Sequence, residues 1–114
     1  MGLDITPEAL ERFLAAGEGP VVLVNLLKLK PGGEEAYRRY GEAVSPLLAR
    51  HGAEPIYSGR AAGALIGDDE WDLAAVTRWP SRAALAGLVR DPDFEAATQL
   101  RYAALEDGVL YAFT

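Results

Sequence analysis

The sequence predicts an α+β domain built on one antiparallel sheet. Apolar stretches of strand length alternate with longer segments whose apolar residues recur at helical spacing, and Gly or Pro breaks separate them. Two of the strand-like stretches follow each other with no helix between them, which predicts a hairpin and hence antiparallel pairing. At 114 residues the chain has room for a single domain.

Residues 1–19 predict a helical extension, and residues 20–114 predict the main domain. Thr6 is a good N-cap for the first helix, and Pro7 suits its first turn. Gly17 ends this helix before the first strand begins.

The first predicted strand, residues 21–30, contains a lone amide, Asn25. The strand is apolar in both side-chain phases as far as Leu27, so both of its faces should be covered. A buried side-chain amide without a hydrogen bond costs about 1–3 kcal/mol. Asn25 therefore either ties down neighbouring backbone or lines a pocket and points at something polar.

The middle of the chain predicts one long helix and a hairpin. Apolar residues at helical spacing indicate a helix over residues 34–51, which Gly52 ends. The second strand is expected over residues 54–66 and the third over residues 71–79, joined by a turn at residues 67–70.

Two helix starts and a last strand complete the chain. Ser81 caps a short helix, and Asp91 with Pro92 restarts helix after it. Gly108 is expected to separate this second helix from the last strand, residues 109–113.

After the N-terminal helix the expected order is β-α-β-β-α-β. These two split βαβ units are the ferredoxin-like arrangement, with both helices on one face of a four-stranded antiparallel sheet. The other face would be bare, and we expect it to be too apolar to face water. A homodimer with the two sheets face to face would cover it. The residues assigned to this bare face are Leu23, Leu27, Trp71, Leu73 and Tyr111.

Composition excludes several classes of function. The net charge is −6, with 17 acidic and 11 basic residues, and no basic stripe exists for nucleic acid. The absence of cysteine excludes disulfides, thiolate metal sites and cysteine nucleophiles. No signal-peptide pattern and no apolar run of about 20 residues is present. We therefore expect a cytoplasmic protein with neither nucleic acid nor membrane as a partner.

A series of short motifs, fairly specific in order and spacing, runs through Pro20 to about Phe113. The motifs are Val24-Asn25-Leu26-Leu27-Lys28, Arg39-Tyr40-Gly41, Pro46-Leu47-Leu48, Gly59-Arg60, Trp71-Asp72, Trp79-Pro80-Ser81-Arg82, and Arg90-Asp91-Pro92 before a helix with Phe94 and Arg101. In these motifs the chain resembles the family catalogued as domain of unknown function 1330 (DUF1330), of the dimeric α+β barrel superfamily.

The resemblance implies a ferredoxin-like protomer that dimerises through its sheets, and it supplies no settled reaction. Relatives in the wider superfamily include cofactor-free monooxygenases, haem-degrading enzymes and small-molecule isomerases, but likeness of fold alone does not establish function. Trp79 stands where the family usually has Phe or Tyr, and the small pair Ala74-Ala75 would enlarge a cavity.

Three residues are candidates for catalytic roles. Arg101 shares a helical face with apolar residues, so it either pairs with Asp72 or another carboxylate, or directs its guanidinium at a ligand carboxylate or enolate, or is exposed. In an enzyme, Asn25 and Arg101 would stabilise oxyanion charge and Tyr40 would transfer a proton. The alternative for Tyr40 is a place in the core.

Four further residues are candidate ligand-binding residues. Arg60 and Arg78 occupy sheet positions, where an arginine commonly lies at the solvent-exposed rim. Trp71 and Trp79 would form either core and dimer packing or aromatic walls for a flat ligand. His51, the lone histidine, lies at a helix end without an obvious partner, and axial ligation of haem is its alternative role. No metal-ligand spacing occurs, so we expect no metal.

The function that these residues predict is binding or transformation of a small, partly apolar, anionic metabolite without a metal or bound cofactor. A non-catalytic dimeric binding or stress-associated module, in which the polar residues only organise the dimer, is the alternative. A haem-handling or monooxygenase-like protein is a third hypothesis.

Overall fold

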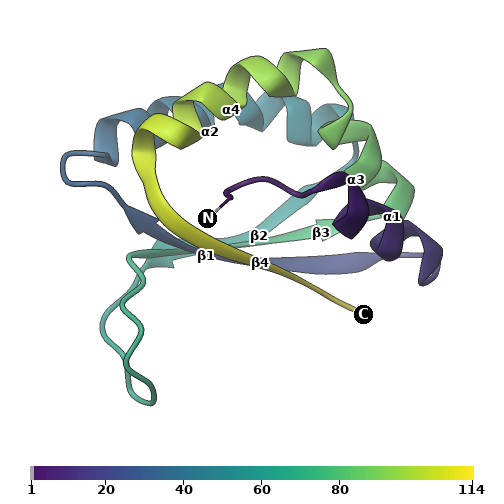
Figure 1. Cartoon of the computed structure of the whole chain (residues 1–114). Coiled ribbons are helices and arrows are strands. Elements are labelled where there is room, and N and C mark those ends of the chain that lie inside the picture. Colours follow the sequence, from purple (N-terminus) through teal and green to yellow (C-terminus); the bar gives the residue numbers. More distant parts are fainter. Residues whose placement is uncertain (1) are drawn as a thin grey trace.

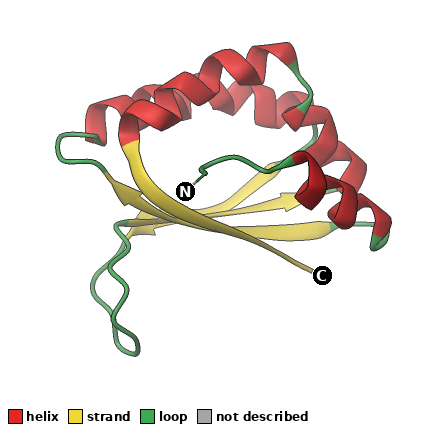
Figure 2. Cartoon of the chain, in the orientation of Figure 1, coloured by secondary structure: helices red, strands yellow, loops and turns green. Residues whose placement is uncertain are grey.

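The chain folds into one four-stranded antiparallel sheet with its helices on one face (Figures 1 and 2). The computed structural model describes residues 2–114. Met1, the first residue of the expected 1–19 extension, lies outside the described residues. The strand order is β2-β3-β1-β4, which confirms the α+β ferredoxin-like arrangement predicted from the sequence.

The helices begin where the sequence predicts them. In chain order the elements are α1 (Pro7–Ala15), β1 (Val21–Leu29), α2 (Glu34–Arg50), β2 (Glu54–Arg60), β3 (Leu73–Trp79), α3 (Arg82–Val89), α4 (Pro92–Ala104) and β4 (Leu105–Phe113). The side chains of Thr6, Ser81 and Asp91 each accept a backbone N–H in the first turn of α1, α3 and α4, respectively. Each of these caps satisfies a donor that the helix itself leaves unpaired.

The two strands of the β2–β3 hairpin are shorter than predicted, and the connection between them is longer. β2 ends at Arg60, not at residue 66, because Arg60 pairs with Leu73, the first residue of β3. The Ala61 N–H donates to the Asp72 carbonyl at 2.9 Å and closes the ladder there. The positive φ values of Gly63 (143°) and Gly67 (101°) interrupt the extended backbone that a longer strand would need.

Residues 61–72, here called the arm, connect the two strands of this hairpin. The arm projects from the sheet on the side away from the helices (Figure 1). Leu65 and Ile66 near its tip are 99% and 98% exposed. Trp71, predicted to begin the third strand, lies in the arm instead.

β4 begins directly after α4, four residues earlier than predicted. Ala104 ends the helix and Leu105 starts the strand, with no loop residue between them. Gly108, expected to break the chain, lies within β4 instead. A Cβ at this position would lie 3.3 Å from Leu27 Cδ2 and 3.5 Å from the Leu26 carbonyl oxygen, so the close packing of β1 against β4 explains the glycine.

The faces of the sheet are the reverse of those predicted for β1. Leu23 and Leu27 are only 5% and 1% exposed and pack beneath the helices, and Leu73 packs with Leu27. Tyr111, as predicted, is exposed. Apolar residues occupy both alternating sets of positions in β1, so the sequence could not show which set faces the helices.

The face away from the helices, here called the outer face, carries the other phase of each strand. Opposed residues on paired antiparallel strands point to the same side of a sheet, so the register defines the face. Its apolar members are Val22, Val24, Leu26, Tyr57, Ala74, Val76, Val109, Tyr111 and Phe113.

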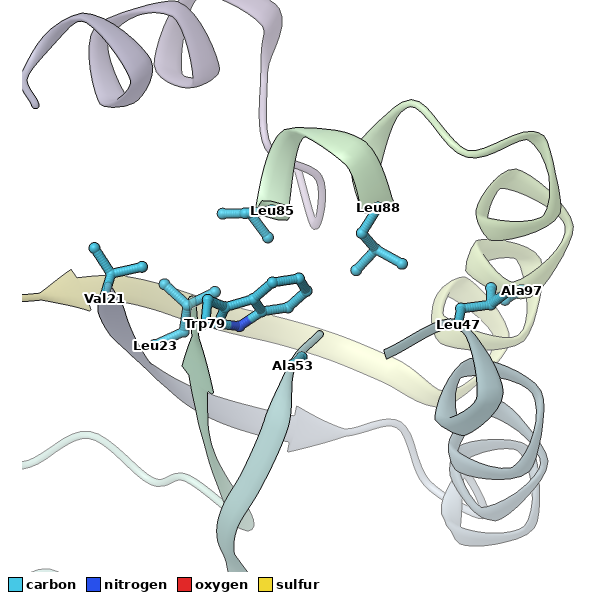
Figure 3. Packing of buried hydrophobic residues seen from close by; sticks show 8 residues of the cluster. All are labelled: Val21, Leu23, Leu47, Ala53, Trp79, Leu85, Leu88 and Ala97. Atoms are coloured by element: carbon cyan, nitrogen blue, oxygen red, sulfur yellow. The ribbon is translucent and has the colours of Figure 1, made fainter. Parts of the chain in front are cut away.

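The buried core is divided into two clusters. The first lies beneath α3, where Leu85 and Leu88 cover Trp79 (Figure 3). The second consists of Leu27, Ala104 and Leu105, at the junction of α4 and β4. Leu23 of β1 belongs to the first cluster and Leu27 to the second, so Asn25 lies between the two clusters on the same strand.

Candidate functional site

A cavity of about 870 Å³ lies between the inner face of the sheet and the helices. Asn25 contributes to its floor, together with the cross-strand partners Ala75 and Leu110. Ala75 is one of the two small residues expected to enlarge a cavity. The volume falls within the roughly 300–1,000 Å³ usual for small-molecule sites. The polar lining residues from α2 and α4 are Tyr37, Tyr40, Glu95, Thr98, Arg101 and Tyr102.

Arg101 is the cation that α4 brings to this cavity. Its side chain is 15% exposed, and Nη2 donates a hydrogen bond of 2.5 Å to the Leu3 carbonyl. Nη1 lies 3.9 Å from Asp4 Oδ1, and the guanidinium carbon lies 5.8 Å from the centre of the Tyr40 ring. Arg101 is thus largely removed from water, and its carboxylate partner lies at the limit of an ion pair.

Of the two structural partners expected for Arg101, Asp72 or another carboxylate, the structure shows another carboxylate, Asp4, and not Asp72. Asp72 Oδ2 accepts the Leu29 N–H at 2.8 Å, and the Asp72 N–H donates to the Leu27 carbonyl at 2.8 Å. Asp72 therefore holds the start of β3 against the end of β1. Its carboxylate accepts a backbone N–H that the hydrogen bonds of the sheet leave unpaired.

Tyr37 and Tyr40 stand side by side on α2, with ring centres 6.0 Å apart. Burial raises the pKa of Tyr40 to about 12, although the positive charge of Arg101 opposes that rise. Burial also raises the pKa of Tyr37. Both hydroxyls are therefore protonated near neutral pH, which makes them hydrogen-bond donors and makes Tyr40 a poor source of phenolate base.

Asn25 and Trp79 also line the cavity. Within residues 2–114 no side-chain hydrogen bond involves the Asn25 amide, so pocket lining is the alternative that the structure supports. Trp79 reaches the cavity from the first core cluster, and its Nε1 donates to Thr77 Oγ1 at 2.9 Å.

Three of the predicted ligand-binding residues lie elsewhere. Arg60 is exposed at the end of β2, Trp71 lies in the arm, and Arg78 is exposed on the outer face opposite Val22. None of the three lines the cavity. The structure therefore brings together Asn25, Tyr40, Arg101 and Trp79, and it leaves Arg60, Trp71 and Arg78 apart.

Sequence reasoning missed the segment that covers the cavity. Residues 2–6, here called the strap, run along the side between α4 and β4 and contribute to the lining (Figure 1). Tyr102 donates a hydrogen bond of 2.5 Å to Asp4 Oδ2. Leu3 packs with the second core cluster and Ile5 with the first. The alternation of apolar Leu3 and Ile5 about Asp4 was the available signal.

His51 has a partner that sequence reasoning also missed. Its Nε2 lies 2.7 Å from Asp91 Oδ2, so the expectation of no partner is wrong; the two residues are far apart in sequence and meet where α2 ends and α4 begins. His51 does not line the cavity, so axial ligation of haem there gains no support.

The described part of the chain offers neither a metal cluster nor a membrane helix. No group of three or more His, Asp or Glu side chains in residues 2–114 is placed to hold a metal ion. None of the helices in these residues combines the length and the apolar character that a membrane crossing requires.

Solved structures of similar proteins share this architecture. A protein of unknown function from Rhodopseudomonas palustris is 33% identical over 97% of this chain and 94% of its own, with a TM-score of 0.86. Its methylated form, 31% identical, covers 99% of this chain and 93% of its own, with a TM-score of 0.88.

More distant structures agree in fold alone. A dimeric ferredoxin-like protein from Bacteroides fragilis is 18% identical over 83% of this chain and 95% of its own (TM-score 0.63). One from Jannaschia is 10% identical over 84% of this chain and 99% of its own (TM-score 0.69). No curated protein matches the chain. The sequence profile of the domain of unknown function 1330 (DUF1330) matches residues 26–112, and the chain belongs to that family.

Proposed function

We propose that this protein binds a small, partly apolar carboxylate in the cavity, with Arg101 as the anchor of the carboxylate. One observation carries the proposal: a guanidinium only 15% exposed lines the cavity, and its carboxylate partner is 3.9 Å away. A desolvated arginine gains most from two parallel hydrogen bonds to one carboxylate. The bond to the Leu3 carbonyl uses only one nitrogen of the guanidinium.

The remaining lining fits the apolar part of such a ligand. Leu23, Val44, Leu48 and Phe94 line the cavity, and the amide of Asn25 and the hydroxyl of Tyr40 supply additional polar groups. A mostly apolar pocket with a few convergent polar groups is the usual form of a small-molecule site.

Catalysis at this site would depend on the same donors. Asn25 and Arg101 are the types of group that stabilise an oxyanion formed from a bound carbonyl compound. With a pKa of about 12, Tyr40 serves better as a hydrogen-bond donor than as a base. These properties support binding more directly than turnover.

The first test combines native mass spectrometry with a panel of probes. Native spectra of gently purified protein would show extra mass that denaturation removes if a ligand is retained. The panel consists of butyrate, hexanoate and phenylacetate, each compared with its neutral amide in a thermal shift assay. We expect a carboxylate at saturating concentration to raise the Tm by about 2–5 °C while its amide does not.

The matched variants are Arg101→Ala and Arg101→Lys. We expect Arg101→Ala to lose the response to carboxylates while remaining folded, and Arg101→Lys to keep part of it because a point charge replaces the two-pronged contact. A folded Arg101→Ala protein that still responds would contradict the proposal. If Arg101→Ala unfolds and Arg101→Lys is folded but responds to no carboxylate, Arg101 is a structural residue.

We further propose that the protein is a cytoplasmic homodimer that buries the outer face of each sheet. Tyr111 and Phe113 are 64% and 53% exposed on that face, which is more apolar surface than a monomer usually leaves open. The arm projects from the same side, so a second copy packed on the outer face would also meet Leu65 and Ile66. Dimeric ferredoxin-like neighbours support this assembly, and the lack of cysteine fits a reducing compartment.

A further inference from the structure

We propose that the strap, which lines the cavity, is an internal competitor for Arg101: the Leu3 carbonyl and the Asp4 carboxylate hold the guanidinium until the ligand displaces them. This inference rests on the carboxylate site proposed above and concerns its regulation. It follows from what the strap contacts, how firmly each end of it is held, and how closely its chemistry matches that of the proposed ligand.

The strap occupies the polar groups that a carboxylate would use. Arg101 Nη2 donates to the Leu3 carbonyl at 2.5 Å, and Nη1 faces Asp4 Oδ1 at 3.9 Å. The hydroxyl of Tyr102 donates to the other oxygen, Asp4 Oδ2. The two terminal nitrogens of the guanidinium thus face two oxygens that come from neighbouring residues. A bound carboxylate would present both of its own oxygens to the same two nitrogens.

The strap also supplies an apolar group next to its carboxylate. Leu3 packs with the second core cluster, and its Cδ2 would lie 3.8 Å from a Cβ at Gly108. An aliphatic side chain and a carboxylate on adjacent residues reproduce the chemistry of a partly apolar carboxylate. A ligand and the strap would therefore compete for the same positions.

The two ends of the strap are held differently. At the Thr6 end, the threonine side chain caps α1, and Arg82 fastens that helix by donating to the Phe13 carbonyl at 3.0 Å. At the Asp4 end, the carboxylate is 52% exposed and its ion pair with Arg101 is long, so that pair contributes little. This end is held instead by the hydrogen bonds from Tyr102 to Asp4 and from Arg101 to Leu3, and by the packing of Leu3. None of these contacts involves α1, so a ligand that replaces them at Arg101 lets the strap turn near Thr6 without moving that helix.

Removing the competing carboxylate should therefore strengthen ligand binding. The apparent affinity of a site equals its intrinsic affinity multiplied by the fraction of molecules in which the site is free. We expect Asp4→Asn to bind hexanoate or phenylacetate up to about threefold more tightly than the wild type, because the neutral amide loses the modest attraction to Arg101 while the Leu3 carbonyl keeps its hydrogen bond. Isothermal titration calorimetry measures both dissociation constants.

The control is Glu8→Gln, which removes the same charge from an exposed position in the first turn of α1, outside the strap. If the general negative charge of the region weakened anion binding, Glu8→Gln would tighten it to the same extent as Asp4→Asn. Equal affinities for the two variants, or an unchanged or weaker affinity for Asp4→Asn, would overturn the competitor while leaving the site itself intact. If neither wild type nor variants bind any carboxylate of the panel, the proposed function fails and the competitor fails with it.

Hydrogen exchange gives an independent readout. The N–H groups of residues 3–6 donate no hydrogen bond within residues 2–114, so on addition of phenylacetate they should still exchange fast if the strap is displaced, while those of α4 exchange more slowly. Slower exchange in the strap would mean that it closes over the ligand, and that result would also overturn the proposal.

Discussion

Asn25 lies on the inner face of β1 between Leu23 and Leu27, which are both buried. At a position of this kind an apolar residue of similar shape is nearly neutral or stabilising if the amide has no essential partner. We expect Asn25→Leu to raise the free energy of unfolding by about 1 kcal/mol and to weaken carboxylate binding. Urea denaturation and calorimetry measure the two effects.

Thr77→Val is the matched control for Asn25→Leu. Thr77 also lines the cavity, but its Oγ1 accepts the hydrogen bond of the buried Trp79 indole. Removing that acceptor should lower the free energy of unfolding by about 1–3 kcal/mol, because the donor is left unpaired. If Asn25→Leu were as destabilising as Thr77→Val, Asn25 would be a structural residue.

At the same residue scale, the sequence identified Asn25, Tyr40 and Arg101 as candidates but missed Thr98 and the partners of Arg101. Arg101 could be placed on the inner face of its helix because helical spacing is local. Its contacts with Leu3 and Asp4 join opposite ends of the chain, and no local pattern encodes them. The partner of His51 was missed for the same reason.

At the scale of whole elements, a cluster of charges joins α2 to α4. Asp91 Oδ2 accepts from Arg50 Nη1 at 2.8 Å and lies 2.7 Å from His51 Nε2, while its other oxygen caps α4. The hydrogen bond with His51, the backbone N–H of Asp93 and the bond with Arg50 hold the pKa of Asp91 at about 2.

This lowered pKa predicts how stability depends on pH. The carboxyl has a lower pKa in the folded chain than in the unfolded chain, so it contributes stability above about pH 4 and loses that contribution as the pH falls towards 2. We expect the urea midpoint of Asp91→Asn to lie below that of the wild type at pH 6 and to converge with it near pH 2. A gap of constant size across this range would show that the charge of Asp91 is not what stabilises the junction.

Element ends were predicted well where a side chain fixes them and poorly where pairing fixes them. Thr6, Ser81 and Asp91 cap helices by contacts within three residues, so a short motif suffices. The end of β2 depends on its register with β3, which brings Arg60 opposite Leu73 across the arm. Only the folded sheet determines that register.

At the scale of the whole molecule, the outer face predicts how copies of the chain associate. Val24 lies on the outer face between Val76 and Tyr111. We expect Val24→Arg to convert the proposed homodimer to a monomer, because a charge at the centre of the proposed apolar interface would have no partner. Light scattering coupled to size-exclusion chromatography reports the mass.

Ser45→Arg, at an exposed position of α2, is the control and should remain dimeric. The double variant Leu65→Asp with Ile66→Asp should weaken the dimer if the arm contacts the second copy. A wild-type monomer at all accessible concentrations would rule out the assembly, and a dimeric Val24→Arg would place the interface elsewhere.

Ala104, the last residue of α4, is followed directly by Leu105, the first residue of β4. This junction links the helices on one side of the sheet to the outer face on the other. The helix that carries Arg101 continues, without a loop to absorb movement, into the strand that carries Tyr111 and Phe113. In the proposed dimer, a ligand that shifts α4 would also shift the edge strand against the second copy. Reciprocity of coupled equilibria then requires that dimerisation change ligand affinity by the same factor as the ligand changes dimerisation. Occupancy measured at a fixed ligand concentration would consequently depend on the concentration of the protein itself.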